Sequence, residues 1–593
     1  MTTAFPHRIR LRIVGQSGSG LNSVGIILAR ALRDLGLFVV TDREYPSLII
    51  GGHSNFTINF SPQPIHGLSN EADVMLALDK PCLVTYKNTL KDGGMLVHGY
   101  ERMWGIKKIL AELEERSIQI IHAPAETIVE KNRGKFFMTN VVLIGMVWKT
   151  LGFPLEKIEA AIKTQFSKRP QLLETNLQCL RDGYDQVASD DTIQNSKFKI
   201  QNFGENNTKK IILDGNHAIA LGAVAGGMQA YFAYPMSPAS SILSYLAVMA
   251  PESGILVKQI EDEISVANMT LGAAHAGTRA MTATSGGGFD LMTETVSLSG
   301  IIETPLVIVI AQRPGPATGL PTWTGQGDLL LAVHSGHGEF GRAVMTVSDA
   351  NDAFYRTQEA FNIAEKYQIP VVLLTEKFIA ESHKTVEPFD GDRIPMERGL
   401  PDESELENLK KEDRYALTES GISTRWIPGS SPAYYFANGD EHGPDGRLDE
   451  SENAGDMIDK RCRKRETMKQ EFPDPEIYGK ETADISFVGW GSTKSVMLDV
   501  IEYFAEKNVA VNYLHYTYLW PLKTDLYEKF REKNPNLHLI EGNHDGQLGK
   551  LLASEGATKI AEKNQLLKWN GRPFFLEDVI AYIEEHSNMK AVD

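Results

Sequence analysis

The sequence predicts an α/β protein made of several domains, each with a largely parallel sheet. Two stretches, TPLVIVIAQ at 304–312 and PVVLLTE at 370–376, are almost entirely apolar, as strands buried on both faces of a parallel sheet are. A strand, a helix and a second strand follow one another over 9–47, which is the repeating unit of such folds. The 593 residues exceed what one core serves, so we expect about three or four domains.

The first block is expected to cover residues 1–190. It opens with IRLRIVG at 9–15, a strand-like alternation, and a glycine turn then leads into an amphipathic helix that ends near Gly36. Further short strands, spaced by helices, are predicted at 38–47, 72–79, 82–88, 93–99 and 119–125. The polar stretch 191–208 shows no apolar period and predicts a linker.

Two more α/β blocks follow the linker. The second is expected over 209–385 and contains both apolar strands. Residues 386–478 are charged and rich in loop-forming residues, and we interpret them as a connector. The third block, 479–593, has strand patterns in DISFVGWGS, VAVNYLH and LHLIEGN.

Bulk properties narrow the function classes. The net charge of −17 argues against nucleic acid or an anionic membrane as the main partner. Cys82, Cys179 and Cys462 lie far apart and predict neither a disulfide framework nor a Cys-x-x-Cys metal site, which indicates a reducing compartment. The first residues carry charges too early for a signal peptide, and no window approaches the ~18 to 20 apolar residues of a membrane span. We expect a cytoplasmic protein.

The glycine turn near the N-terminus leaves several interpretations open. Gly15, Gly18 and Gly20 form G-x-x-G-x-G and not the G-x-G-x-x-G of dinucleotide-binding proteins. We favour a tight strand-to-helix turn whose glycines allow close packing. An anion bound at the helix N-terminus is the main alternative. A nicotinamide dehydrogenase is a minor one, because the intervening serines would crowd a pyrophosphate.

The stretch AYPMSPASSI at 233–242 indicates that a strand ends and a helix begins. Pro235 and Pro238 cannot both lie in one helix or one central strand. Pro238 suits the first helical position and Ser237 suits the N-cap. Such a helix would point its free amides at the turn, where a carboxylate could bind.

A carboxylate lies beside small residues in the next helical pattern. Five apolar residues recur at helical spacing and would share one face of a helix: Ile260, Ile264, Ala267, Leu271 and Ala274. Glu263 lies next to this face, whereas Glu261 is roughly opposite and is expected in water. Glu263 is either a boundary residue with its carboxylate in water or a catalytic acid or base in apolar surroundings.

A strand pattern at 279–285 follows and runs into Gly286, Gly287 and Gly288, ahead of another expected helix. Glycines at this point let a bound group approach the backbone closely.

Long runs of the chain follow one another in a familiar order: GNHAIALGAVAGG, YPMSPASS, EDEISVANMTLGAAHAGTRAMTATSGGGFDLMTE, PLVIVIAQRPGPATGLPT, HSGHGEF, GDEHGPDGRLDE, DISFVGWGSTKSVMLDVI, LHYTYLWPL and EGNHDGQLGKLL. They resemble the alpha subunit of the 2-oxoacid:ferredoxin oxidoreductases, and the 2-oxoglutarate type is matched best. The first block, with YPSLIIGGHSNF, resembles the separate gamma subunit of these enzymes. The resemblance implies a gamma-type domain over 1–190, a thiamine-diphosphate pyrimidine-binding domain over 209–385 and a transketolase C-terminal-like domain over 479–593.

That family decarboxylates a 2-oxoacid with thiamine diphosphate, passes two electrons through an iron–sulfur cluster to ferredoxin, and releases an acyl-CoA. The resemblance implies that this chain holds the aminopyrimidine ring. A beta subunit would hold the diphosphate, Mg²⁺ and a [4Fe–4S] cluster, in an assembly of two alpha and two beta chains. The expected reaction converts 2-oxoglutarate and coenzyme A to succinyl-CoA. The sequence lacks a Gly-Asp-Gly motif followed at the expected distance by Asn, and lacks clustered cysteines, so we expect the chain alone to be inactive.

The resemblance also implies roles for single residues around the cofactor. Glu263 matches the family's cofactor glutamate, which hydrogen-bonds an aminopyrimidine nitrogen so that the cofactor can take the proton from its own thiazolium carbon. Tyr234, Pro235, Ser285 and Gly286 match positions beside the cofactor.

Ser237, Arg313 and Thr322 match positions that bind the 2-oxoacid, and Arg313 could hold its carboxylate as a fork. Ser237 stands where the family usually has threonine. His334 and His337 are weak evidence for a metal, and we interpret them as structural or at the edge of the active site.

Two alternatives stay open. One is specificity for pyruvate or a branched-chain 2-oxoacid, which the beta subunit would help decide. The other is a non-catalytic scaffold subunit, against which the retained glutamate, arginine and hydroxyl argue.

Overall fold

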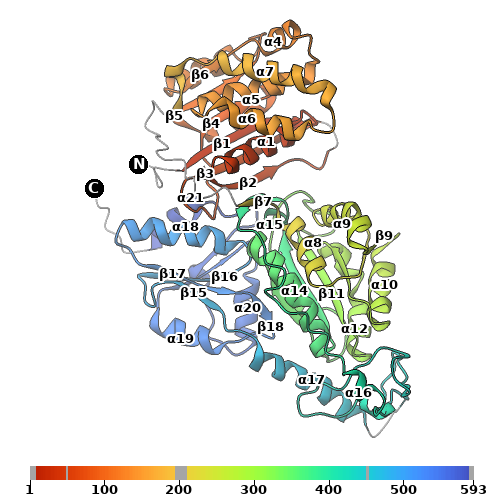
Figure 1. Ribbon diagram of the computed structural model, residues 1–593. Coiled ribbons are helices and arrows are strands. Elements are labelled where there is room, and N and C mark those ends of the chain that lie inside the picture. Colours follow the sequence, from red (N-terminus) through yellow and green to blue (C-terminus); the bar gives the residue numbers. More distant parts are fainter. Residues whose placement is uncertain (1–7, 49–50, 194–209, 449–452, 587–593) are drawn as a thin grey trace. The chain divides into compact units, whose positions relative to one another are not determined.

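The computed structural model describes residues 8–48, 51–193, 210–448 and 453–586, and it confirms an α/β fold (Figure 1). The expected linker at 191–208 lies almost wholly outside these ranges. The chain divides into two compact units. One contains residues 1–213, 382–388 and 575–581, and the other contains 214–381, 389–574 and 582–593.

The first unit is built on a mixed sheet with the strand order β6-β5-β4-β1-β3-β2-β14-β7. Its strands are β1 (Ile9–Ser17), β2 (Phe38–Glu44), β3 (Gly51–Ser61), β4 (Ala72–Ala77), β5 (Leu90–His98), β6 (Gln119–His122), β7 (Ile211–Leu213) and β14 (Lys384–Val386). β1, β4, β5 and β6 are parallel, but β3 is antiparallel to both β1 and β2. The short strands β7 and β14 reach this sheet from stretches that we expected at the ends of the second block.

Helices cover both faces of this sheet. The larger core joins β1 and β3 to helices α1 (Leu21–Asp34), α5 (Thr139–Thr150), α6 (Leu155–Gln165) and α7 (Leu173–Asp185), which lie together in Figure 1. A second core lies under α2 (Lys80–Tyr86) and α3 (Lys107–Glu115). The unit therefore has three layers, as α/β domains with helices on both faces do.

The strand predicted at 82–88 is wrong, because most of this stretch lies in helix α2. Asp79 caps the helix by accepting a hydrogen bond from the amide of Cys82 at 2.9 Å, and Pro81 lies in its first turn. Proline and an acidic N-cap are both helix-start signals. Here they outweighed the β-branched and aromatic residues that suggested a strand.

The N-terminal glycines form the tight turn that we favoured. Gly18 and Gly20 have φ angles of 88° and 85°, a region that glycine enters without strain. A Cβ at Gly25, inside α1, would come within 2.5 Å of the Phe56 ring of β3. At the turn itself, a Cβ at Gly15 would come within 2.8 Å of Ser19 Oγ and 3.2 Å of Leu78, so close packing accounts for Gly15 and positive φ angles for Gly18 and Gly20.

The second unit contains a seven-stranded sheet with the order β18-β12-β13-β11-β10-β8-β9. Its strands are β8 (Ala230–Ala233), β9 (Leu256–Gln259), β10 (Ala280–Thr284), β11 (Leu306–Gln312), β12 (Ala343–Thr346), β13 (Pro370–Glu376) and β18 (Tyr518–Trp520). All neighbours are parallel except β18 at the edge. β11 and β13 are fully buried, which confirms the two apolar strands.

A five-stranded sheet in the same unit has the order β15-β17-β16-β19-β20. Its strands are β15 (Glu476–Gly479), β16 (Ile485–Trp490), β17 (Val511–Tyr516), β19 (Leu537–Glu541) and β20 (Gln565–Leu567). The three strand patterns of the third block match β16, β17 and β19. One apolar cluster includes residues of both sheets, among them Ile308 and Trp490.

The helices of the second unit include α8 (Gly215–Ala225), α12 (Thr293–Ile301), α14 (Ala350–Tyr367), α18 (Thr493–Glu506), α19 (Asp525–Lys533) and α20 (Gln547–Ser554).

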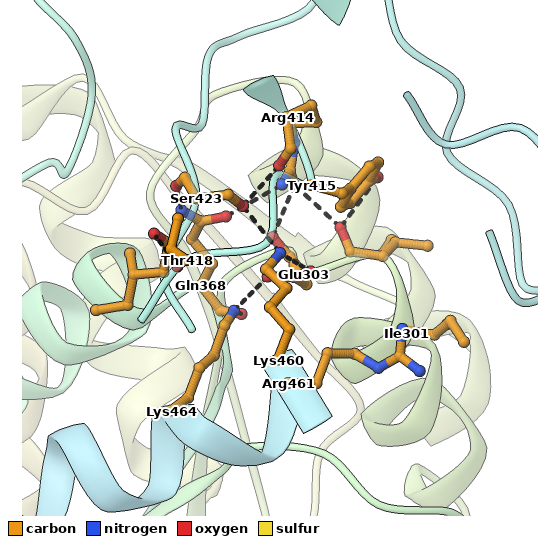
Figure 2. A network of polar contacts seen from close by, with 12 residues as sticks. Ile301, Glu303, Gln368, Arg414, Tyr415, Thr418, Ser423, Lys460, Arg461 and Lys464 are labelled. Atoms are coloured by element: carbon orange, nitrogen blue, oxygen red, sulfur yellow. Dashed lines mark hydrogen bonds and ion pairs between the residues drawn. The ribbon is translucent and has the colours of Figure 1, made fainter. Parts of the chain in front are cut away.

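The charged connector is fixed by a buried ionic cluster. Helix α17 (Ala454–Glu471) places Lys460 and Lys464 against Glu303, with Nζ–Oε distances of 2.5 and 2.6 Å (Figure 2). The side chains of all three are at most 1% exposed. Arg414 also donates to the Glu303 carbonyl at 2.8 Å. A buried carboxylate shared by two ammonium groups therefore ties the connector to the segment before β11.

Candidate functional site

The candidate site lies where neighbouring parallel strands of the seven-stranded sheet end. Ser237 follows β8, Ser285 follows β10 and Arg313 follows β11, and these three strands are adjacent in the order β11-β10-β8. Glu263 begins helix α10 (Glu263–His275), which follows the next strand, β9. Ligands of open α/β sheets bind beyond the carboxyl ends of the strands. The topology thus gathers the residues that the sequence had singled out at intervals of 22 residues or more.

The turn after β8 differs from the expected N-cap at Ser237. Helix α9 (Ser240–Ser253) begins later, its N-cap residue is Ala239, and no side chain caps it. The buried Asn216 determines this geometry: its Nδ2 donates to the Pro238 carbonyl at 2.8 Å and to Ser241 Oγ at 2.6 Å. Ser237 is therefore an exposed turn residue, not a helix cap.

Arg313 and Ser237 are in direct contact. Nη1 of Arg313 donates to the Ser237 carbonyl at 2.8 Å, so the guanidinium spans the gap between the ends of β11 and β8. Burial lowers the pKa of Arg313, and Asp328 opposes that shift. Tyr234 and Pro235 are exposed beside this contact, and Thr322 is buried in the loop after β11.

Glu263 is a buried carboxylate at the start of its helix. Asp262 caps α10 by accepting from the Ser265 amide at 2.7 Å, which turns Glu263 inward. Glu263 is only 5% exposed, and its Oε1 is buried without a hydrogen-bond partner among the described residues. The expected helical face was wrong at two positions: Ile264 is 52% exposed, and Ile260 lies before the helix, which begins at Glu263. Glu261 is exposed, as expected.

The glycine run after β10 packs against this carboxylate. Gly286, Gly287 and Gly288 lie inside the short helix α11 (Gly286–Asp290), and not in a loop before it. Ser285 is fully buried at its N-cap, and its hydroxyl donates to the sulfur of Met236. A Cβ at Gly288 would lie 2.9 Å from Glu263 Oε1 and 2.0 Å from Thr284 Oγ1.

Gly288→Ala is therefore expected to destabilise the chain by about 1–3 kcal/mol, because the added methyl overpacks a site lined by Glu263. Gly287→Ala is the matched control: only the Ala317 carbonyl, at 3.6 Å, lies near its Cβ position. Thermal denaturation of both variants checks the prediction. Equal melting temperatures would show that the Gly288 contact is not tight.

Asp328 and Asn216 belong to this region but were not predicted. Asp328 precedes helix α13 (Leu329–His334), and a Cβ at Gly286 would meet its carboxylate. Neither residue follows a strand directly or stands at a periodic position, so local sequence patterns did not single them out. His334 and His337 are exposed, and the described part of the chain shows no cluster of three or more metal-ligating side chains.

Two family models match the chain. Residues 221–458 match the pyruvate flavodoxin/ferredoxin oxidoreductase domain that is described as thiamine-diphosphate-binding. Residues 10–186 match a second domain, pyruvate ferredoxin/flavodoxin oxidoreductase. The two matches define the class of protein: an oxidoreductase subunit with a thiamine-diphosphate-binding domain.

Relatives over the full length make the family more specific. The alpha subunit of a 2-oxoacid:ferredoxin oxidoreductase from a Sulfolobus species is 31% identical over 96% of each chain. A 2-oxoglutarate oxidoreductase subunit KorA from Mycobacterium tuberculosis is 27% identical and covers 98% of this chain and 92% of its own. The structure of 2-oxoglutarate:ferredoxin oxidoreductase from Magnetococcus marinus, with 2-oxoglutarate, coenzyme A and succinyl-CoA bound, is 28% identical, covers 98% and 99%, and has a TM-score of 0.88. The chain belongs to the 2-oxoacid:ferredoxin oxidoreductase family, among its alpha subunits, which confirms the resemblance.

Membrane spanning is a separate matter. Within the described ranges, no helix combines the length and the apolar character that crossing a bilayer requires.

Proposed function

We propose that this chain, together with a beta subunit, oxidatively decarboxylates 2-oxoglutarate to succinyl-CoA and passes the electrons to ferredoxin. The observation that carries the proposal is the buried, unpartnered Oε1 of Glu263 beyond the strand ends. Buried oxygens normally have hydrogen-bond partners, so this one fits a ligand that supplies a donor. The aminopyrimidine of thiamine diphosphate is such a ligand. When bound, the cofactor supplies the electron sink that 2-oxoacid decarboxylation needs.

Oε1 of Glu263 would accept a hydrogen bond from a nitrogen of the pyrimidine ring, so that one proton is shared between the carboxylate and the ring. The surrounding protein excludes water from this carboxylate, which strengthens a single hydrogen bond there. Ser285, Gly286, Tyr234 and Pro235 would lie beside the same ring. Gly287, with open space at its Cβ position, leaves room for a group to approach the backbone.

Arg313 would bind the substrate carboxylate, with Ser237 and Thr322 beside it. Its hydrogen bond to the Ser237 carbonyl uses one donor and fixes the guanidinium, so the remaining N–H groups can meet a carboxylate with little loss of side-chain entropy.

The beta subunit would complete the site with the diphosphate-binding residues, Mg²⁺ and a [4Fe–4S] cluster. Support comes from the full-length match to alpha subunits and from the widely separated positions of Cys82, Cys179 and Cys462. We propose an assembly with two copies of each chain, located in the cytoplasm. Coenzyme A would be the co-substrate.

The test is a co-expressed pair of this chain and its beta subunit, assayed with coenzyme A and a viologen dye. We expect the largest kcat/KM for 2-oxoglutarate, which the Magnetococcus marinus structure and the Mycobacterium tuberculosis relative support. Pyruvate and 2-oxoisovalerate are the competing substrates. A larger value for either would contradict the substrate proposal. A pair loaded with cofactor and cluster that turns over none of them would favour the scaffold alternative.

A further inference from the structure

Asp328 holds its carboxylate in an unusual place for a residue that precedes a helix. It is the N-cap of α13, yet its side chain makes no capping hydrogen bond. An aspartate at this position normally accepts hydrogen bonds from amides of the first helical turn and so stabilises the helix. The backbone is instead anchored by Gln312 at the end of β11, whose Oε1 accepts from the Asp328 amide at 3.0 Å. The carboxylate is thereby directed toward the candidate site.

The carboxylate packs against the glycine run after β10. A Cβ at Gly286 would lie 2.5 Å from Oδ1 and 2.6 Å from Oδ2 of Asp328, so only glycine fits beside it. Oδ2 is buried and has no hydrogen-bond partner among the described residues. An unpartnered buried carboxylate oxygen costs more than a neutral one, unless the group is protonated or meets a donor.

Two charged groups influence Asp328 electrostatically: Asp290 at the end of α11, and Arg313 after β11. Burial is the largest influence and Asp290 adds to it, so the pKa of Asp328 rises to about 7 even though Arg313 lowers it. Reciprocally, Asp328 acts to raise the pKa of Arg313. The acid and the guanidinium are therefore electrostatically coupled within one site.

We propose that Asp328 is a positioning residue that sets the strength with which Arg313 holds the substrate carboxylate. This inference rests on the proposed function. When Asp328 is ionised, it competes with the substrate for the positive charge of Arg313 and repels the incoming carboxylate. When it is protonated, Arg313 keeps its full attraction for the substrate, and the acid can also donate a hydrogen bond.

The sign of the pH effect follows. As pH rises through about 7, Asp328 loses its proton. The KM for the 2-oxoacid should then rise, and kcat/KM should fall, because that ratio reports groups of the free enzyme. We expect about a tenfold change in affinity, which corresponds to about 1.4 kcal/mol of binding free energy.

The experiment measures kcat and KM for 2-oxoglutarate across this pH range in the complex of the full chain with its beta subunit. Wild type should lose about tenfold in kcat/KM on the alkaline side. Asp328→Asn keeps the shape but cannot ionise, so it should flatten this limb and bind substrate more tightly than wild type at high pH. Asp290→Asn, at an exposed neighbour, should retain the limb and move its midpoint to lower pH.

A second readout does not depend on turnover. Infrared difference spectra of the purified chain between acid and alkaline pH should contain a carboxyl band that titrates near 7 and is missing in Asp328→Asn. The proposal is overturned if active Asp328→Asn complex keeps the wild-type pH profile, or if the spectra show no such band. Absence of turnover in wild type would instead contradict the proposed function on which the inference rests.

Discussion

Replacing Glu263 by glutamine is expected to lower the kcat of the complex by at least about 100-fold, because an amide cannot share a proton as a carboxyl group does. Glutamine has nearly the same shape, so the fold should survive the change. Dye reduction that depends on 2-oxoglutarate gives the rate, and circular dichroism of the chain confirms folding.

Glu261→Gln provides the matched control for this variant. Glu261 lies two residues earlier and is exposed, so the same chemical change there should leave the rate at the wild-type level. Full activity of Glu263→Gln would refute the role of Glu263. Equal losses in both variants would show that the effect is not specific to the buried carboxylate.

Glu303→Ala is expected to reduce stability by about 3–5 kcal/mol, the usual cost of removing one partner from a buried ion pair. The change removes the carboxylate that pairs with the two buried ammonium groups of Lys460 and Lys464 on α17 (Figure 2). Hydrogen exchange should show lost protection of α17, and the melting temperature should fall.

A triple variant separates charge imbalance from lost packing. Glu303, Lys460 and Lys464 all changed to methionine should recover most of the stability, because replacing a whole buried cluster by apolar residues is often nearly neutral. A triple variant as unstable as Glu303→Ala would show that packing, not charge, fixes the connector.

The same cluster predicts how stability depends on pH. Burial alone would raise the pKa of Glu303, but Lys460, Lys464 and Arg414 lower it below its ordinary value of 4.5. A group with a lowered pKa in the folded state stabilises the protein above its unfolded pKa, and that contribution is lost as pH falls. Wild type should therefore lose stability below about pH 4.5 more steeply than the triple methionine variant.

Sequence patterns predicted those elements whose buried residues recur at the spacing of a strand or a helix. The apolar strands β11 and β13 are examples, as is the small-residue side of α10 that includes Ala267 and Ala274. The errors arose where two local signals competed or where a partner was distant. In the stretch 82–88, helix-start residues outweighed strand-forming ones, and at Ser237 the buried Asn216 shifted the start of α9.

The candidate site shows the same division. Glu263 could be singled out because it adjoins a small-residue face, whereas Arg313 was singled out only through the family resemblance. Asp328 could not, since its role depends on Gly286, 42 positions away in the sequence. The charges of α17 contributed to the interpretation of 386–478 as a charged connector, because no sequence pattern shows that Glu303 pairs with Lys460 and Lys464.

The buried Oε1 of Glu263, which has no hydrogen-bond partner among the described residues, has a consequence for the newly made chain. The newly made polypeptide alone carries a desolvation penalty of about 1–3 kcal/mol at that atom, and only a bound group with a suitable donor removes it. A ligand that donates to this oxygen would therefore stabilise the folded chain by mass action. Protein loaded with such a ligand should therefore unfold at a higher temperature than the empty chain.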